Sequence, residues 1–298
     1  SIPAHRLAKL SGIGCSSKTP TYFLNKSHGF NSVHGRMPSV TTGANAANRS
    51  LTYIGVSGDG DSLSIGMGQF AHAIRRNVNM CYVIENNGVY GLTKGQYSAS
   101  ADVGSVAKKS SANQLKPIDP VITAIAMGAT YVARSFSGDK TQLVPLLQGA
   151  INHKGFALVD VISPCVTFNN NEGSTKSYAY TRKHFNTVIN ADYIEPSEEI
   201  LASYDDGEAM KVKLHDGSHI VFRKLDKDYD PTSRENTYSF LRHSSKRGEI
   251  NTGLLFLDED VKDMHFDRKT VDKPLVELSY EELKPSNSCL DDLMDKFR

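Results

Sequence analysis

The 298 residues of the chain are enough to bury a substantial core, and 34 basic against 33 acidic side chains leave a formal charge of +1 at pH 7. The chain has no apolar run long enough to cross a bilayer, no signal-peptide pattern and no stripe of interleaved basic and aromatic residues. We therefore expect a cytoplasmic protein that binds neither membranes nor nucleic acid. Four irregularly spaced cysteines also exclude the disulfide framework of a small secreted protein.

Charge is distributed unevenly along the chain. Only 26 of the first 190 residues are charged, against 41 of the last 108. The first part holds 18 Lys and Arg against 8 Asp and Glu, and the second part holds 16 against 25. This shift predicts a main domain at 1–190, whose positive charge favours anionic small molecules, and an accessory segment at 191–298.

From residue 51 onward, strand and helix patterns alternate. Apolar runs at 51–58, 78–86, 130–136 and 155–163 predict strands. The intervening patterns at 64–77, 119–129 and 139–154 predict helices, the second with Asp119 as N-cap and Pro120 at its first position. The first helix would bury Ile65, Phe70, Ala73 and Ile74 on one face. Strands that are apolar on both faces predict a doubly wound, mostly parallel α/β sheet with helices on both sides.

The last part of the chain has a different pattern. Residues 210–225 predict a hairpin that turns at Asp216-Gly217, and residues 230–248 predict a capped helix. The final stretch is charged and loop-like. We expect a charged α+β extension, which could pack on a partner or form a solvated edge of the same domain.

Polar groups follow two neighbouring strands of the predicted sheet. Gly58-Asp59-Gly60-Asp61 follows the first strand and Asn86-Asn87 follows the second. One βαβ unit brings both loops to the same edge, so Asp59 and Asn87 should converge. A carboxylate, an amide oxygen and a backbone carbonyl just past Asn87 suit Mg²⁺, which completes its octahedron with phosphate oxygens and water. Alone, the first motif could be only a tight turn; with the asparagines it predicts a magnesium-diphosphate clamp.

Several blocks, in order, carry a family resemblance: SGIGCSSK (11–18), HGRMPSVTTGANAAN (34–48), GDGDSLSIG (58–66), RRN (75–77) and NNGVYGLTKGQ (86–96). Gly-Asp-Gly followed by Asn-Asn is the pattern of thiamine diphosphate enzymes. From about residue 8 to 171, the chain resembles the β subunit of 2-oxoacid:ferredoxin oxidoreductases, most closely the 2-oxoglutarate type. The resemblance implies the thiamine diphosphate-binding fold.

The resemblance implies a cofactor site. Mg²⁺ would be bound by Asp59, Asn87 and the main-chain oxygen of Val89, and His34 and Lys18 are the candidate catalytic residues. The residues expected around thiamine diphosphate are Gly14, Cys15, Ser16, His34, Gly58, Asp59, Gly60, Asp61, Asn87, Val89, Tyr90, Gly91, Leu92 and Thr93.

Two cysteines match family ligands of a [4Fe–4S] cluster. Cys15 and Cys165 would supply two thiolates, whereas a cubane is commonly held by four. The family carries the other two in a Cys-x-x-Cys motif near its N-terminus. This chain has no such motif, so we expect a missing preceding segment or a cluster-depleted form. The alternative is that both residues are simply buried thiols.

The resemblance also places a substrate pocket. Lys18, Arg36, Leu92 and Lys94 would border the 2-oxoacid. A cation there would suit the distal carboxylate of 2-oxoglutarate through a charge-assisted hydrogen bond. Either lysine could instead be an ordinary solvated side chain.

The predicted reaction is the reversible oxidative decarboxylation of 2-oxoglutarate with coenzyme A, giving succinyl-CoA, CO₂ and reduced ferredoxin. The chain has no evident glutamate to activate the cofactor, and in the family the α subunit supplies it. We therefore expect a chain that is inactive alone and works as a dimer of αβ pairs. The alternatives are preference for pyruvate or a broad range of 2-oxoacids, a non-oxidative thiamine diphosphate lyase or synthase, and a non-catalytic nucleotide-binding module.

Overall fold

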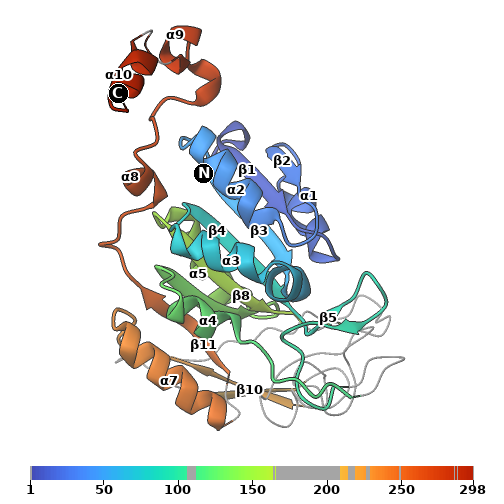
Figure 1. Cartoon of the computed structure of the whole chain (residues 1–298). Coiled ribbons are helices and arrows are strands. Elements are labelled where there is room, and N and C mark those ends of the chain that lie inside the picture. The colour runs from blue at the N-terminus through green and yellow to red at the C-terminus, as the bar shows by residue number, and fades with distance from the viewer. Residues whose placement is uncertain are drawn as a thin grey trace.

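The fold is built on one long sheet, seen in a computed structural model of the chain (Figure 1). The structure describes residues 2–105, 112–163, 165, 209–213, 219–225, 229–247, 250–284, 286 and 288–297. Three predicted features lie outside these residues: the domain boundary near 190, the end of the family resemblance at 171 and the hairpin turn at Asp216-Gly217.

Nine strands of the described part form this sheet in the order β2-β1-β3-β4-β8-β7-β11-β10-β9. The first six in this order are parallel, β11 is antiparallel to β7, and β10 is parallel to β11. The doubly wound, mostly parallel sheet is confirmed. The strands are β1 (Leu7–Ser11), β2 (His28–Asn31), β3 (Thr52–Gly58), β4 (Met80–Asn86), β7 (Tyr131–Phe136), β8 (Phe156–Ile162), β9 (Ala209–Lys213), β10 (His219–Lys224) and β11 (Asn251–Leu257).

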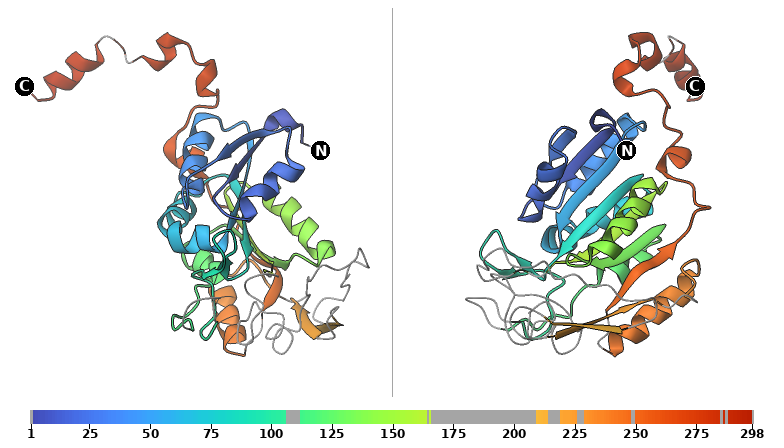
Figure 2. Two further views of the ribbon diagram at one scale, coloured as in Figure 1. Left: turned by 90° about the vertical axis from the view of Figure 1, so that its right-hand side faces the viewer. Right: turned by 180° about the vertical axis from the view of Figure 1, so that it is seen from behind.

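Helices cover both faces of the sheet (Figures 1 and 2). One face carries α2 (Met37–Ala47), α3 (Met67–Arg75), α4 (Pro120–Ala126) and α7 (Arg234–Lys246), whose apolar side chains join one core cluster with the strands. The other face carries α5 (Lys140–Asn152), which packs on a second cluster. Because the inner strands are covered on both sides, most of their side chains are apolar, as the sequence pattern predicts; Arg134 on β7 and Asp160 on β8 are buried exceptions.

The predicted strands at 51–58, 78–86, 130–136 and 155–163 are confirmed as β3, β4, β7 and β8. The predicted N-cap is also confirmed, because Asp119 Oδ1 accepts hydrogen bonds from Val121 N at 2.8 Å and Ile122 N at 3.2 Å. The helix at 139–154 is α5, and Asp139 caps it in the same way.

The predicted helix at 64–77 begins later than expected. A π-helical turn, η3 (Gly60–Ile65), follows β3 directly, and α3 starts only at Met67. Phe70 and Ala73 are buried as predicted, but Ile65 is 46% exposed. The expectation that Ile65 joins the buried face is wrong, because the wider turn rotates it out of register with α3.

The end of the chain is more ordered than predicted. The hairpin is confirmed as antiparallel β9 and β10, and the helix at 230–248 is confirmed as α7. The prediction that the final stretch is loop-like is wrong, because β11 pairs with β7 inside the main sheet. The chain then forms α8 (Met264–Arg268), α9 (Tyr280–Leu283) and α10 (Cys289–Asp295), which extend from the body as an arm (Figure 2).

Strands β1 and β2 were not predicted, and they add two parallel strands at one edge of the sheet. Within the described part of the chain, none of the helices combines the length and the apolar character that a bilayer crossing needs.

Candidate functional site

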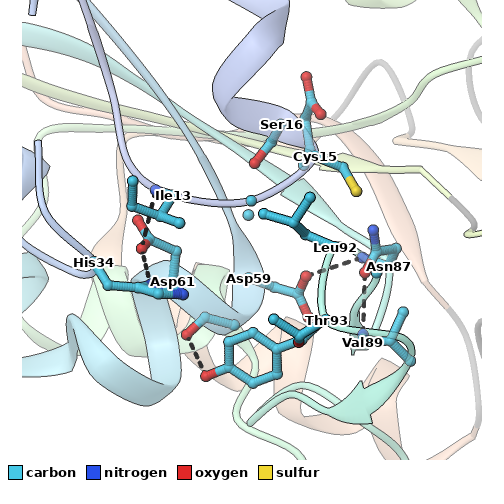
Figure 3. Close-up of a pocket in the computed structure, with 16 residues that line it drawn as sticks. Ile13, Cys15, Ser16, His34, Asp59, Asp61, Asn87, Val89, Leu92 and Thr93 are labelled. Atoms are coloured by element: carbon cyan, nitrogen blue, oxygen red, sulfur yellow. Dashed lines mark hydrogen bonds and ion pairs between the residues drawn. The ribbon is translucent and has the colours of Figure 1, made fainter. Parts of the chain in front are cut away.

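The carboxyl ends of three neighbouring strands meet at one edge of the sheet. Strands β1, β3 and β4 are adjacent and parallel, and they lead into residues 12–16, 58–61 and 86–93. Figure 3 shows side chains from these three loops facing one pocket. Ligands of open parallel sheets bind at such an edge.

The pocket brings the predicted cofactor residues together. All fourteen of them line it, and Ile13 and Glu85 line it as well. Sequence reasoning missed both additions, although Glu85 directly precedes the asparagine pair. The convergence is a property of the structure, whereas the role of each residue stays a prediction.

Asp59 is buried at the base of the pocket, with 1% of its surface exposed. Its Oδ2 accepts hydrogen bonds from Gly88 N at 3.0 Å, from Ser100 Oγ at 2.5 Å and from Ser98 Oγ. Its Oδ1 accepts a single, longer bond from Asn87 N, at 3.3 Å. The predicted meeting of Asp59 with Asn87 is therefore confirmed (Figure 3). The two serines were not predicted, since nothing in the polar loop that carries them distinguishes them.

Asp61 connects three segments around the pocket. Its Oδ1 accepts hydrogen bonds from Gly35 N at 2.8 Å and Ile13 N at 3.3 Å, and it contacts His34 Nδ1. Its Oδ2 accepts a bond from Ser57 Oγ at 2.5 Å. The contact holds the ring of His34 through Nδ1, and His34 is one of the residues that line the pocket.

Gly60 allows Tyr90 to pack closely against the backbone at the pocket. A Cβ atom added to Gly60 would lie 2.6 Å from a ring carbon of Tyr90, so only glycine fits there. The Tyr90 hydroxyl donates to Gly60 O at 2.9 Å. Burial raises the pKa of Tyr90, so this hydroxyl keeps its proton at neutral pH. The tyrosine and the glycine therefore hold each other in place.

Glu85 is the acidic residue that the sequence analysis did not single out. It is the second-last residue of β4, next to Asn86, and is half-buried. Burial raises the pKa of its carboxyl above the ordinary value, against a hydrogen bond with Thr19 that lowers it. The pocket thus contains a carboxyl group of increased proton affinity.

Three of the predicted substrate residues do not line the pocket. Lys18, Arg36 and Lys94 are exposed and lie on segments that border it, whereas Leu92 lines it. Lys94 has a left-handed backbone (φ 78°) in the turn between β5 (Val89–Tyr90) and β6 (Gln96–Tyr97). The structure places the charges at the rim of the site rather than inside it.

Cys15 and Cys165 face the same glycine. A Cβ atom added to Gly91 would lie 3.3 Å from Cys15 Sγ and 3.6 Å from Cys165 Sγ. Cys15 is exposed and Cys165 is half-buried, so the alternative of two buried thiols does not hold for Cys15. Two thiolates are half of the set that a cubane needs, so the described residues alone do not complete a cluster site.

The site fits a magnesium-bound diphosphate. Asp59 Oδ1 accepts a hydrogen bond from the backbone N–H of Asn87 at 3.3 Å, and the side-chain oxygen of Asn87 accepts one from Val89 N at 3.0 Å. Among the described residues, no group of three or more His, Cys, Asp or Glu side chains forms a metal site by itself. A carboxylate oxygen and an amide oxygen suit a hard cation that takes its remaining ligands from phosphate and water.

An α/β sheet with a pocket at the carboxyl ends of neighbouring parallel strands has the architecture of a ligand-binding domain of the doubly wound class. Residues 12–161 match the family described as thiamine pyrophosphate enzyme, C-terminal TPP binding domain, and the chain belongs to this family.

Curated relatives are similar to the same part of the chain. The 2-oxoglutarate oxidoreductase subunit KorB of Mycobacterium tuberculosis is 44% identical over 161 residues, which are 54% of this chain and 43% of that protein. The 2-oxoacid:ferredoxin oxidoreductase subunit beta of Saccharolobus solfataricus is 42% identical over 174 residues, 58% of this chain and 56% of that protein. The match therefore spans about half the length of these relatives.

A solved structure resembles the whole chain. It is a 2-oxoglutarate:ferredoxin oxidoreductase from Magnetococcus marinus with 2-oxoglutarate, coenzyme A and succinyl-CoA bound. The TM-score is 0.70 at 27% identity, over 100% of this chain and 84% of that one. The resemblance to 2-oxoacid:ferredoxin oxidoreductase β subunits, expected from the sequence, is confirmed.

Proposed function

We propose that the chain is the β subunit of a 2-oxoacid:ferredoxin oxidoreductase of the 2-oxoglutarate type. It would work with an α subunit, coenzyme A and ferredoxin, as a dimer of αβ pairs. The observation that supports this most is the meeting of Asp59 with Asn87 in a pocket lined by all the residues expected around thiamine diphosphate. The names of the relatives support the reaction class.

The proposal assigns chemical roles to several groups of the pocket. Asp59, Asn87 and the carbonyl oxygen of Val89 hold Mg²⁺, which binds the diphosphate of the cofactor. When bound, thiamine diphosphate supplies the electron sink for cleavage next to the 2-oxo group. His34, held by Asp61, presents Nε2 to the pocket and can donate or accept a proton there. The electron carrier would be a [4Fe–4S] cluster, with Cys15 and Cys165 as two of its ligands.

In this proposal, the specificity for 2-oxoglutarate depends on the basic side chains that border the pocket. Lys18 follows the pocket residue Ser16 within one 3₁₀ turn, so its ammonium group can reach over the pocket. A dicarboxylate would bond to it through the carboxylate far from the reacting carbon, whereas pyruvate has no such group. Arg36 and Lys94 add positive charge at the same rim.

The test uses the full-length chain together with its α subunit. We expect CoA-dependent reduction of ferredoxin by 2-oxoglutarate, and loss of at least about a hundredfold in kcat/KM in Asp59→Ala, because one metal ligand is removed. Asp291→Asn, an exposed aspartate on α10, is the matched control.

The same preparations are titrated with thiamine diphosphate and Mg²⁺ by calorimetry. Metal-dependent binding in the wild type that is absent in Asp59→Ala supports the proposal. Cofactor binding that Asp59→Ala leaves unchanged would refute the clamp, and activity of the isolated β chain would refute the need for the α subunit.

A further inference from the structure

Two serines from one loop bind the inner oxygen of Asp59. Ser98 and Ser100 follow β6, and 6% and 1% of their surfaces are exposed. Both hydroxyls reach Asp59 Oδ2, which also accepts a bond from Gly88 N. Gly88 N and Ser98 Oγ donate to this oxygen, and Ser100 Oγ, whose one proton is shared with Asn86 Oδ1, lies 2.5 Å from it. Three close neighbours leave this carboxylate oxygen no room for a metal ion.

The other oxygen of Asp59 is bound differently. Oδ1 accepts one hydrogen bond, from Asn87 N, and its 3.3 Å length lies beyond the usual range of strong N–H···O bonds. Figure 3 shows this oxygen on the side of Asn87 and the pocket. The carboxylate therefore offers a single oxygen to a ligand.

The loop that carries the serines is fixed on several sides. Ser98 N donates to Gly88 O at 3.1 Å, and Ala99 N donates to Ser64 Oγ at 2.9 Å. Ala99 O accepts a bond from Ile118 N at 2.8 Å, just before α4. Since the loop is held by backbone bonds, it positions its hydroxyls rather than following the carboxylate.

Ser100 also belongs to a buried polar chain. Its Oγ lies 2.9 Å from Asn86 Oδ1, and Asn86 Nδ2 donates to Asp160 Oδ1 at 3.1 Å. Arg134 Nε donates to Asp160 Oδ2 at 2.7 Å. All of these groups are buried, so the hydroxyl has a rigid second neighbour.

We infer that Ser98 and Ser100 are positioning residues that keep Asp59 a one-oxygen ligand and so select Mg²⁺ over Ca²⁺. Mg²⁺ requires a near-ideal octahedron with short bonds and keeps several of its waters, which one carboxylate oxygen allows. Ca²⁺ takes more oxygen ligands, at 2.3–2.6 Å, and often binds a carboxylate through both oxygens. The serines deny it the second oxygen. The inference depends on the proposed function, because it concerns the same metal site.

The test compares two metal affinities in the complete αβ enzyme after removal of metal. Calorimetric titrations with Mg²⁺ and with Ca²⁺, each at saturating thiamine diphosphate, give the ratio of the two affinities. In the double variant Ser98→Ala/Ser100→Ala we expect this ratio to fall about tenfold or more, the size typical of a lost outer-shell bond. The single variants should each give part of the change, and they replace the double variant if it does not fold.

Two further variants separate positioning from loss of stability. Ser98→Thr/Ser100→Thr keeps both hydroxyls and should restore the wild-type ratio. Ser135→Ala removes an equally buried hydroxyl, bonded to Gln142 at 2.9 Å and outside the polar chain, and should leave the ratio unchanged.

An unchanged ratio in folded alanine variants would overturn the inference while leaving the proposed function intact. A wild-type enzyme that binds thiamine diphosphate without any divalent metal would instead overturn the proposed function.

Discussion

At the scale of single residues, the two aspartates of Gly58-Asp59-Gly60-Asp61 have separate partners. Asp59 bonds to the loops that follow β4 and β6, and one of its oxygens faces the pocket. Asp61 bonds to backbone groups of Ile13 and Gly35 and contacts His34. One acidic group thus faces the pocket, and the other connects the segments that surround it.

Lys18 is the residue on which substrate choice should depend. In Lys18→Met we expect KM for 2-oxoglutarate to rise about 10–100-fold, because a charge-assisted hydrogen bond of roughly 1.5–3 kcal/mol is lost. The kcat/KM for pyruvate should hardly change, since pyruvate has no distal carboxylate. Steady-state kinetics with both substrates measure this. Lys26→Met, which removes another exposed lysine in the same part of the sequence, is the control. Equal losses with both substrates would contradict the assignment.

His153 should make stability depend on pH. Its Nε2 lies 2.7 Å from Thr130 Oγ1, and burial lowers its pKa below the ordinary 6.5, against a smaller opposite effect of Asp258. The unfolded chain therefore binds the proton more readily, so this contribution is full above about pH 6.5 and is lost as the pH falls towards the folded pKa. In calorimetric melts, His153→Gln should lose less Tm between pH 7.5 and 5.5 than the wild type. An equal loss in both proteins would show that another group is responsible.

At the scale of elements, Arg134 joins β7, β8 and α4. Its guanidinium donates to Asp160 at 2.7 Å and to Asp119, the N-cap of α4, at 2.6 Å. Burial alone would raise the pKa of Asp119, but Arg134 holds it below the ordinary value. The helix start and the sheet are therefore connected by one cation.

Removing this cation should be costly. We expect Arg134→Met to lower the free energy of unfolding by about 3–5 kcal/mol, since the buried carboxylate of Asp160 loses its partner and the half-buried Asp119 loses its ion pair. Arg75→Met, on the exposed side of α3, should change it by less than about 0.5 kcal/mol. Urea denaturation followed by circular dichroism measures both. A loss below 1 kcal/mol in Arg134→Met would mean that the network relaxes around the gap.

The strands of the sheet that could be predicted most directly are those with a mostly apolar sequence. β3, β4, β7 and β8 are buried on both faces, so composition alone reveals them. All four residues of β2 are exposed, so this edge strand has no hydrophobic period to detect. β11 lies in a charged part of the chain and contains a register shift between Leu254 and Phe256, which breaks its alternation.

The same contrast holds within the site. The pairing of Asp59 with Asn87 follows from strand topology and could be predicted. Ser98 and Ser100 reach Asp59 from a loop whose path is set by backbone hydrogen bonds to Gly88 and Ser64. No spacing rule encodes such a path, so their role required coordinates.

At the scale of the whole molecule, the arm that follows β11 is attached at one place. Met264 and His265 in α8 are buried, and Met264 N donates to Asn77 O at 3.0 Å. Asp272 pairs with Arg49 at 2.8 Å. From Pro274 onward, none of the described side chains is buried, and Figure 2 shows this part extending away from the body.

Truncation should therefore show that the two parts of the arm contribute differently to stability. A stop codon at Pro274 should change the Tm of the chain by no more than about 2 °C, because exposed residues contribute little. Met264→Ala should lower the free energy of unfolding by about 2–5 kcal/mol, since it empties a core position. Thermal melts of both variants decide this, and a large loss on truncation would show that the outer helices stabilise the body.

The position of β11 in the sheet has a consequence for biosynthesis. β7 ends at Phe136, but the strand that covers its free edge begins only at Asn251. A ribosome needs on the order of 10 s to make the intervening residues. During that time the N–H and C=O groups on one edge of β7 have no partner strand in the nascent polypeptide. Such an edge can pair with another chain and aggregate, so we expect a chaperone to cover it.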